Sequence, residues 1–130
     1  QLKRINSTVK KKMYIGNYYF KKLSNNKSLY MTPPQINQFK NIYWVVGIVI
    51  KNKKFLASQI IKKLSKYGIG ARPFFWPMHE QDIFKKMKIF KKQNYPNSSY
   101  LGRYGFYIPS FLKIKDSEMN YVVSVINKLL

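Results

Sequence analysis

The stretch IYWVVGIVI, residues 42–50, is the longest apolar run in the chain. Its β-branched and aromatic residues favour extended structure, and a run without polar interruption is typical of a strand that is covered on both faces. We therefore predict that residues 42–50 form the central strand of a sheet. The run is far too short for a membrane-spanning helix, which needs roughly 20 apolar residues.

The chain that follows this run predicts a helix and an edge strand. A turn is expected at residues 52–54. Apolar residues then recur at three- and four-residue steps over residues 55–64, which indicates an amphipathic helix, and Gly68 is expected to end it. Residues 69–75 have the composition of a strand, but Pro73 cannot donate a hydrogen bond to a neighbouring strand. We therefore place this strand at an edge or an irregular end of the sheet.

The elements farther downstream are expected to be short, apart from the last one. Residues 76–95 predict a loop with one short helix at residues 81–87. A short helix over residues 97–104 and a short strand over residues 106–108 follow. Asp116 is then expected to cap a final helix, because its side chain can accept hydrogen bonds from the first turn. The apolar stripe of that final helix is formed by Met119, Val122, Val123, Ile126 and Leu129 or Leu130.

Upstream of the central run, the periodicity predicts an amphipathic helix over residues 1–23 and a short strand over residues 28–32. The helix starts without a capping signal, so we expect the chain to be part of something longer. Taken together, the elements predict one domain, residues 1–130, with an α+β fold. A small, mostly antiparallel sheet is packed with helices.

The charge of the chain gives the first indication of a possible binding partner. The net charge is +21, no cysteine is present, and the basic residues are overwhelmingly lysine. A basic nucleic-acid-binding module is therefore one alternative, with Tyr18, Tyr19 and Phe20 available for stacking. Because the lysines are scattered along the chain, we favour solvated helix faces and do not expect a nucleic-acid partner. We expect no membrane partner, because no apolar run is long enough to span a bilayer. The lack of cysteine fits a cytoplasmic or otherwise reducing setting.

The chain contains few residues that could act in catalysis. The four carboxylates, Glu80, Asp82, Asp116 and Glu118, lie where helices are expected to start, and helix dipoles favour acids there. A metal site is not expected, because the chain has one histidine and no cysteine. We therefore assign no catalytic residue and no metal ligand.

The most unusual segment is GIGARPFFWPMHEQ, residues 68–81. It combines an arginine, three consecutive aromatic residues and the only histidine. Arginine suits a phosphate or carboxylate, and aromatic faces suit a base or a sugar. The alternative is a strand end with core aromatics and a histidine that only holds the loop. The candidate substrate-binding residues are Arg72, Phe74, Phe75, Trp76 and His79.

This segment resembles a motif of the DegT/DnrJ/StrS-type sugar aminotransferases, in which a Gly-Ile pair, an Arg-Pro, aromatic residues and a Pro-Met-His follow one another. The resemblance extends to QLKRI at residues 1–5, Tyr43-Trp44, Tyr95-Pro96-Asn97 and GFYIPS at residues 105–110. It is most similar to members that aminate a GDP-linked 4-keto-6-deoxy sugar, the perosamine synthase type. The resemblance therefore covers nearly the whole chain.

The resemblance implies a pyridoxal-phosphate-dependent parent enzyme, normally a homodimer, that makes amino sugars for surface polysaccharide. In such an enzyme a large domain carries the Schiff-base lysine, and this chain would be the carboxyl-terminal small domain, with residues 1–24 as the connecting helix. We then expect no cofactor bound to this chain, no activity of the chain alone, and substrate contacts to a nucleotide sugar, most simply a GDP-sugar. A stand-alone interaction domain from a truncated gene remains a further alternative.

Overall fold

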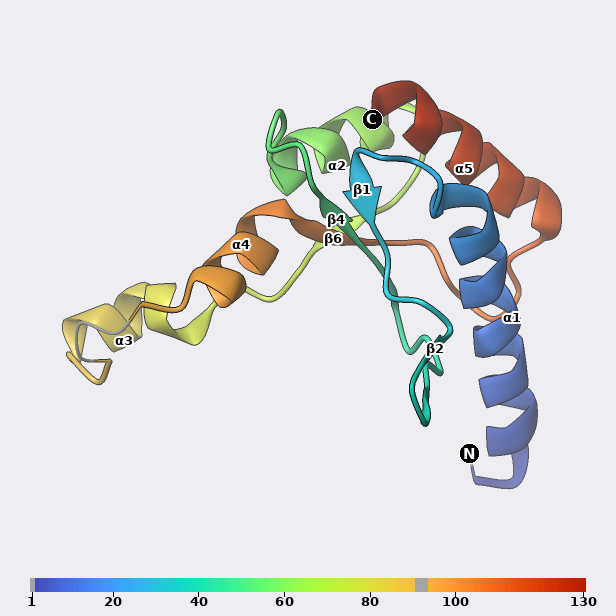
Figure 1. The fold of residues 1–130 in the computed structure, drawn as a ribbon, viewed down its shortest axis with the longest axis horizontal. Helices are drawn as coiled ribbons and strands as arrows, with labels where there is room; N and C mark the ends of the chain where they lie inside the picture. Colours follow the sequence, from blue (N-terminus) through green and yellow to red (C-terminus); the bar gives the residue numbers. More distant parts are fainter. Residues whose placement is uncertain (1, 91–93) are drawn as a thin grey trace.

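The protein is an α+β fold in which helices surround a small antiparallel sheet (Figure 1). The computed structural model describes residues 2–90 and 94–130, so Gln1 and residues 91–93 of the expected loop lie outside the described part. The helices are α1 (Ile5–Leu23), α2 (Ala57–Lys66), α3 (Asp82–Lys86), α4 (Pro96–Tyr104) and α5 (Asp116–Leu129), with 3-10 turns at Leu2–Arg4 and Met78–Glu80. The strands are β1 (Leu29–Tyr30), β2 (Gln35–Ile36), β3 (Phe39–Lys40), β4 (Val46–Ile50), β5 (Arg72–Pro73) and β6 (Gly105–Ile108).

The main sheet has the strand order β1-β4-β6-β5, and every neighbouring pair is antiparallel. The longest strand, β4, therefore occupies an inner position, as predicted for the apolar run. Its register places Ile48 opposite Phe106 of β6, and β6 in turn places Tyr107 opposite Arg72 of β5. The short β5 is an edge strand, which agrees with the expectation from Pro73.

One face of this sheet carries the core. Side chains alternate between the two faces of a strand, so Val46, Ile48 and Ile50 point the same way, and all three are fully buried. They join the buried side chains of α1, α2 and α5 in one cluster, which also contains Phe106 and Ile108. Helix α5 packs against both α1 and α2. The predicted apolar stripe of α5 is thus confirmed, whereas α1 buries Ile15, Tyr19 and Leu23 and leaves Leu2 and Ile5 of its expected stripe exposed.

The apolar run does not form a strand along its whole length, and this corrects the prediction for residues 42–45. Tyr43 has a positive φ of 49°, and its buried ring lies directly on Gly16 of α1, where a Cβ would be 2.1 Å from the ring. The Tyr43 hydroxyl donates a hydrogen bond to the Thr32 carbonyl oxygen at 3.1 Å. The residue that anchors α1 to the sheet therefore interrupts the extended backbone, and β4 begins only at Val46.

Three further differences are local. The predicted strand over residues 69–75 shrinks to Arg72–Pro73, and the β2–β3 hairpin was not predicted. Asp116 is not the cap of α5: Lys115 occupies that position, and its backbone N–H donates to the Glu118 carboxylate at 2.7 Å. Gly68 does end α2 as predicted, with a positive φ of 71° that suits glycine.

Candidate functional site

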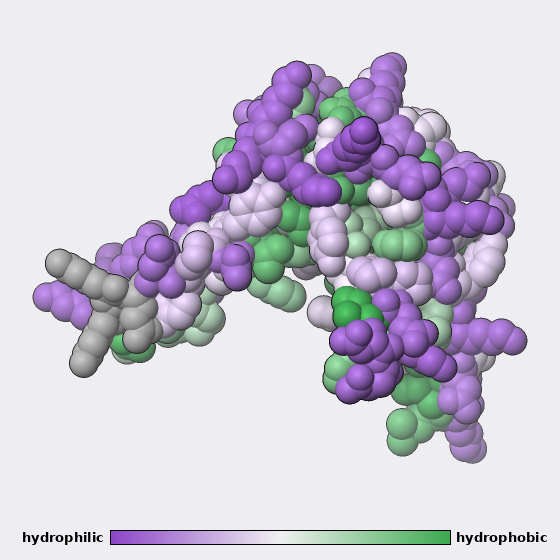
Figure 2. Space-filling model, viewed as in Figure 1, coloured by the Kyte–Doolittle hydropathy of each residue, from purple (hydrophilic) through white to green (hydrophobic). Residues whose placement is uncertain are grey.

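The candidate site lies on the sheet face that the three long helices leave open. A shallow groove there is lined by Trp44, Val45, Arg72, Phe75 and Tyr107. A second hollow continues it toward α4 and shares Val45, Phe75 and Tyr107 with the first. We call the two together the sheet groove. Figure 2 shows apolar side chains gathered in the angle between the α3–α4 side of the molecule and the β2–β3 hairpin.

Phe74 forms the floor of the sheet groove at its α4 end. Its ring stacks on Tyr107, with 5.9 Å between the centroids, and it covers Gly47 and Gly105 of the two inner strands. A Cβ at Gly47 would lie 2.8 Å from Phe74 Cζ, and one at Gly105 would lie 2.3 Å from Phe74 Cδ2. Only glycine therefore allows the ring to lie this close to both strands. Phe74 is half-buried and fixes the floor, whereas Phe75 is exposed along the rim.

Arg72 supplies the positive charge of the sheet groove. It is exposed on β5, and it also lines a neighbouring groove with Ser110 and Glu118, so it stands between two hollows. In the described part of the chain no ion pair involves Arg72, since the pairs there join Glu80 to His79 and Arg103, and Asp82 to Lys85. A guanidinium that is free of a carboxylate partner can bind a phosphate through two parallel hydrogen bonds.

Trp76 and His79 are placed differently from the other candidates. His79 lies on an arm formed by the 3-10 turn, α3 and α4 (residues 77–90 and 94–104), which projects from the sheet in Figure 1, and Trp76 lies where the chain enters this arm. Pro77 is buried against Gly102, where a Cβ would lie 2.7 Å from its ring. Trp76 is 48% exposed, and the Arg103 guanidinium lies 6.0 Å from its ring centroid.

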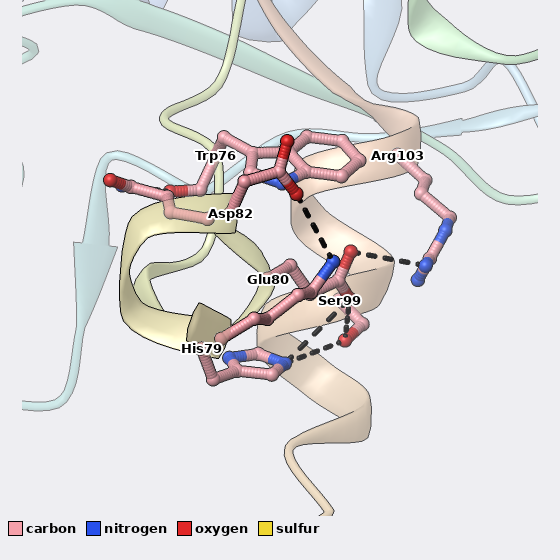
Figure 3. A network of polar contacts seen from close by, with 8 residues as sticks. Trp76, His79, Glu80, Asp82, Ser99 and Arg103 are labelled. Carbon is pink, nitrogen blue, oxygen red and sulfur yellow. Dashed lines mark hydrogen bonds and ion pairs between the residues drawn. The ribbon is translucent and has the colours of Figure 1, made fainter. Parts of the chain in front are cut away.

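His79 belongs to a polar network that holds the arm together (Figure 3). His79 Nε2 lies 3.1 Å from Ser99 Oγ, the Ser99 hydroxyl donates to the Glu80 carboxylate, and Arg103 donates to the other Glu80 oxygen at 3.1 Å. The hydrogen bond from Ser99 and the charge of Arg103 lower the pKa of Glu80. This arrangement supports the loop-holding alternative for His79, and substrate contact by His79 stays a prediction.

Sequence reasoning missed two contributors to the sheet groove and one role in the arm. Tyr107 is not among the candidate residues, yet it faces the groove because Phe106 and Ile108 on either side point into the core. Trp44 is not a candidate either, and it is 68% exposed. Glu80 was explained by a helix dipole, whereas it bonds Ser99 and Arg103. The alternation within GFYIPS was the signal that could have located Tyr107.

The rings proposed for nucleic-acid stacking are not free to stack. Tyr19 is fully buried, and its hydroxyl donates to the Pro109 carbonyl oxygen at 3.0 Å. Tyr18 donates to the Asn120 side chain, and Phe20 is packed against the core. Base stacking needs an accessible aromatic face. These contacts count against the nucleic-acid alternative that used these three residues.

The described residues do not fit a pyridoxal phosphate cofactor. A lysine that forms a Schiff base needs an enclosed pocket and a lowered pKa. Burial lowers the pKa of Lys12, and none of the described lysines is fully buried. The Lys12 ammonium, however, already donates to the carbonyl oxygens of Trp44 at 2.9 Å and Ser110 at 2.7 Å. Lys12 is thus a structural tie between α1 and the ends of two strands.

Residues 2–90 and 94–130 contain neither a metal-binding cluster nor a membrane-spanning helix. No three side chains of the histidine, cysteine, aspartate and glutamate types come together as a metal site would require. No helix within these ranges is both long enough and apolar enough to cross a membrane.

Comparison with known proteins shows that this helix-covered sheet is the fold of a domain found in sugar aminotransferases. A putative sugar aminotransferase, Spr1654 from Streptococcus pneumoniae, matches in its PLP form with a TM-score of 0.87 and 17% identity, over 99% of this chain and 33% of that one. Helicobacter pylori PseC, an aminotransferase of pseudoaminic acid biosynthesis, matches with a TM-score of 0.85 and 16% identity, over 98% of this chain and 34% of that one.

The sequence comparisons add the family. The chain belongs to the DegT/DnrJ/EryC1/StrS aminotransferase family, whose model matches residues 1–127. GDP-perosamine synthase of Escherichia coli O157:H7 is 26% identical over 98% of this chain and 33% of that protein. An uncharacterised protein of Methanocaldococcus jannaschii, MJ1066, is 24% identical over 99% of this chain and 34% of that protein. The chain thus spans about a third of the length of these relatives.

Proposed function

We propose that this chain is the small domain of a pyridoxal-phosphate-dependent nucleotide-sugar aminotransferase, and that the sheet groove forms one wall of its substrate cleft. The observation that carries the proposal is the groove itself: Arg72, which has no ion-pair partner among the described residues, stands beside the exposed rings of Trp44 and Phe75 and the half-buried ring of Tyr107. Family membership supports the reaction class, and the similarity to a GDP-perosamine synthase supports a GDP-linked keto sugar as the substrate.

The chemistry of a nucleotide sugar matches this arrangement. The diphosphate offers oxygens that a guanidinium can bind through two hydrogen bonds, which suits Arg72. The base and the sugar offer flat or apolar faces, which suit Phe75, Trp44 and Tyr107. Phe74 contributes by holding the floor. Trp76 and His79 remain candidates for contacts made from the arm.

The described residues do not fit the cofactor, so on this proposal the tasks of cofactor binding and substrate positioning belong to different domains. When bound, the cofactor supplies the electron sink for amino-group transfer, and on this proposal a second, larger domain carries it. Residues 1–24 then connect the two domains, and the chain alone does not transaminate. Its own residues position the nucleotide sugar, which lowers the entropic part of the barrier. We further propose, from the family resemblance, a homodimeric cytoplasmic enzyme of polysaccharide biosynthesis.

Titration of the isotopically labelled chain with GDP-mannose, a stable GDP-linked sugar, tests the proposal. Amide resonances of residues 44–45, 70–75 and 105–109 should shift together and saturate. Arg72→Gln should weaken the affinity about fivefold, because one exposed charged contact to phosphate contributes on the order of 1 kcal/mol.

Arg4→Gln is the matched control, since Arg4 is an exposed arginine on the 3-10 turn before α1. It removes the same charge and should leave the affinity within about twofold, because Arg4 does not line the sheet groove. Equal weakening by both variants, or shifts that follow the lysines instead of the groove, would refute the proposal.

A further inference from the structure

The end of the domain opposite the hairpin carries a ring of lysines. We call it the basic end and define it by Lys27, Lys51, Lys54, Lys63, Lys66 and Lys128. All but Lys63 are exposed. In Figure 1 helix α2 and the C-terminus lie together at this end, while the β2–β3 hairpin points the opposite way. Figure 2 shows the same end covered by hydrophilic side chains.

Contacts between their neighbours join these lysines into one surface. The backbone N–H of Lys51 donates to the Ser28 carbonyl oxygen at 2.8 Å, so Lys51 lies beside Lys27. Lys54 and Lys63 both lie over the Phe55 ring, at 5.6 and 3.8 Å from its centroid. Lys128 lies 5.6 Å from the Tyr67 ring centroid, next to Lys66. Asn26 and Asn127 close the ring with a 3.0 Å hydrogen bond between their side chains.

Helix dipoles explain only part of this arrangement. Lys63, Lys66 and Lys128 lie in the last turns of α2 and α5, where a cation is stabilised by the dipole. Lys51 and Lys54 lie in the loop before α2 and have no such reason to be basic. The charges of Lys51 and Lys54 therefore extend the positive surface beyond the ends of the two helices.

The four carboxylates of the chain lie away from the basic end. Glu80 and Asp82 are on the arm, where they pair with Arg103 and Lys85. Glu118 lies in the first turn of α5 and Lys128 in its last, which at 1.5 Å per residue separates them by about 15 Å. That distance exceeds the screening length of about 8 Å at physiological salt. The positive potential of the basic end is therefore not neutralised from within the described chain.

The side chains at the basic end are better suited to binding a flat, negatively charged surface than to binding a nucleic acid. Rings that could stack on bases are covered by ammonium groups, as Phe55 and Tyr67 show. None of the three arginines of the chain, Arg4, Arg72 and Arg103, belongs to the ring, although arginine is the residue that reads phosphate and base edges by paired hydrogen bonds. Lysines on flexible stems need no defined geometry, which suits lipid headgroups.

We propose that the basic end binds the surface of an anionic lipid bilayer by reversible electrostatic contact. The arm and the hairpin point away from such a surface in Figure 1. This departs from the sequence-based expectation of no membrane partner, which rested on the absence of a long apolar segment. A surface contact of this kind needs charge and no spanning helix.

Sedimentation with lipid vesicles tests the proposal. The chain should bind vesicles that contain about 30% phosphatidylglycerol at about 150 mM salt and should not bind pure phosphatidylcholine. The triple variant Lys51→Gln, Lys54→Gln, Lys66→Gln should bind about a hundredfold less tightly, since each lysine near the surface contributes about fivefold.

The matched control removes the same three charges elsewhere, at Lys3, Lys10 and Lys86, which are exposed and outside the basic end. It should lose less than about fivefold in total. Equal losses in the two triple variants would show that only net charge matters and would overturn the proposal. So would the absence of binding to anionic vesicles, or tighter binding to single-stranded or duplex oligonucleotides at the same salt concentration.

Discussion

Replacing Gly47 by alanine should destabilise the protein, and the effect should reverse its sign when Phe74 is shortened. Gly47 lies on β4 beneath the Phe74 ring, and the new methyl group would lie 2.8 Å from Phe74 Cζ and 3.2 Å from Cε1. The ring cannot swing away over β6, because Gly105 is in equally close contact with its other edge. The substitution therefore forces either the ring or the strand to move.

The two contributions to the free energy of unfolding have opposite signs. Overpacking of this kind costs about 1–3 kcal/mol. Alanine in a strand interior otherwise gains about 0.5–1 kcal/mol over glycine, because the unfolded chain has less freedom to lose. We expect a net loss of about 1 kcal/mol for Gly47→Ala in the native background. Leucine at position 74 lacks Cζ and Cε1, so in Phe74→Leu only the gain should remain.

The native protein, Gly47→Ala, Phe74→Leu and the double variant form a double-mutant cycle. Urea unfolding of these four proteins, followed by circular dichroism, measures the coupling between positions 47 and 74. Gly70→Ala is the control, because a Cβ there meets no atom within 4 Å. It should be neutral or stabilising by up to about 1 kcal/mol. If Gly47→Ala costs the same free energy in the native and Phe74→Leu backgrounds, Phe74 does not form the floor of the sheet groove and the account of that floor is wrong.

Two predictions concern pH. The Ser99 hydrogen bond and Arg103 lower the pKa of Glu80 below its ordinary value of 4.5; its contribution to stability is complete above that value and disappears as pH falls through the lowered pKa. Glu80→Gln should therefore flatten the acid limb of Tm against pH, and parallel limbs would contradict this. Burial raises the pKa of Tyr43 from 10.0 to about 12, so stability present below pH 10 should decline as pH rises toward 12. Burial raises the pKa of Tyr19 as well, so spectrophotometric titration should show a late phase of tyrosine ionisation whose amplitude Tyr43→Phe reduces, and an unchanged amplitude in that variant would count against the assignment.

The long amphipathic helices were predictable because their patterns are local. Helix α2 has its apolar residues at regular steps and a glycine at its end, and both features are visible within twelve residues. The interruption of the central strand was not visible locally. It depends on Tyr43 meeting Gly16 of α1, a contact that exists only once α1 has packed. The β2–β3 hairpin was missed because each strand has two residues, too few for a period to emerge.

The candidate site was predictable in composition and less so in arrangement. Arg72 and Phe75 were chosen because unusual residues cluster in one segment, and the structure places both at the sheet groove. His79 came from the same segment, yet Pro77 turns the chain onto the arm, where Ser99 of α4 meets the histidine. Adjacency in sequence could not show which residues line the groove and which hold the arm together, because Ser99, the partner of His79, lies twenty residues away.

The ammonium group of Lys12 connects the first helix to two neighbouring strand ends beside the sheet groove. It donates to the Trp44 carbonyl oxygen and to the carbonyl oxygen of Ser110, which follows groove residue Pro109. A single atom on α1 thereby fixes both backbone positions. A rigid shift of α1 would carry the two strand ends in the same direction, and the groove residues next to them would move together.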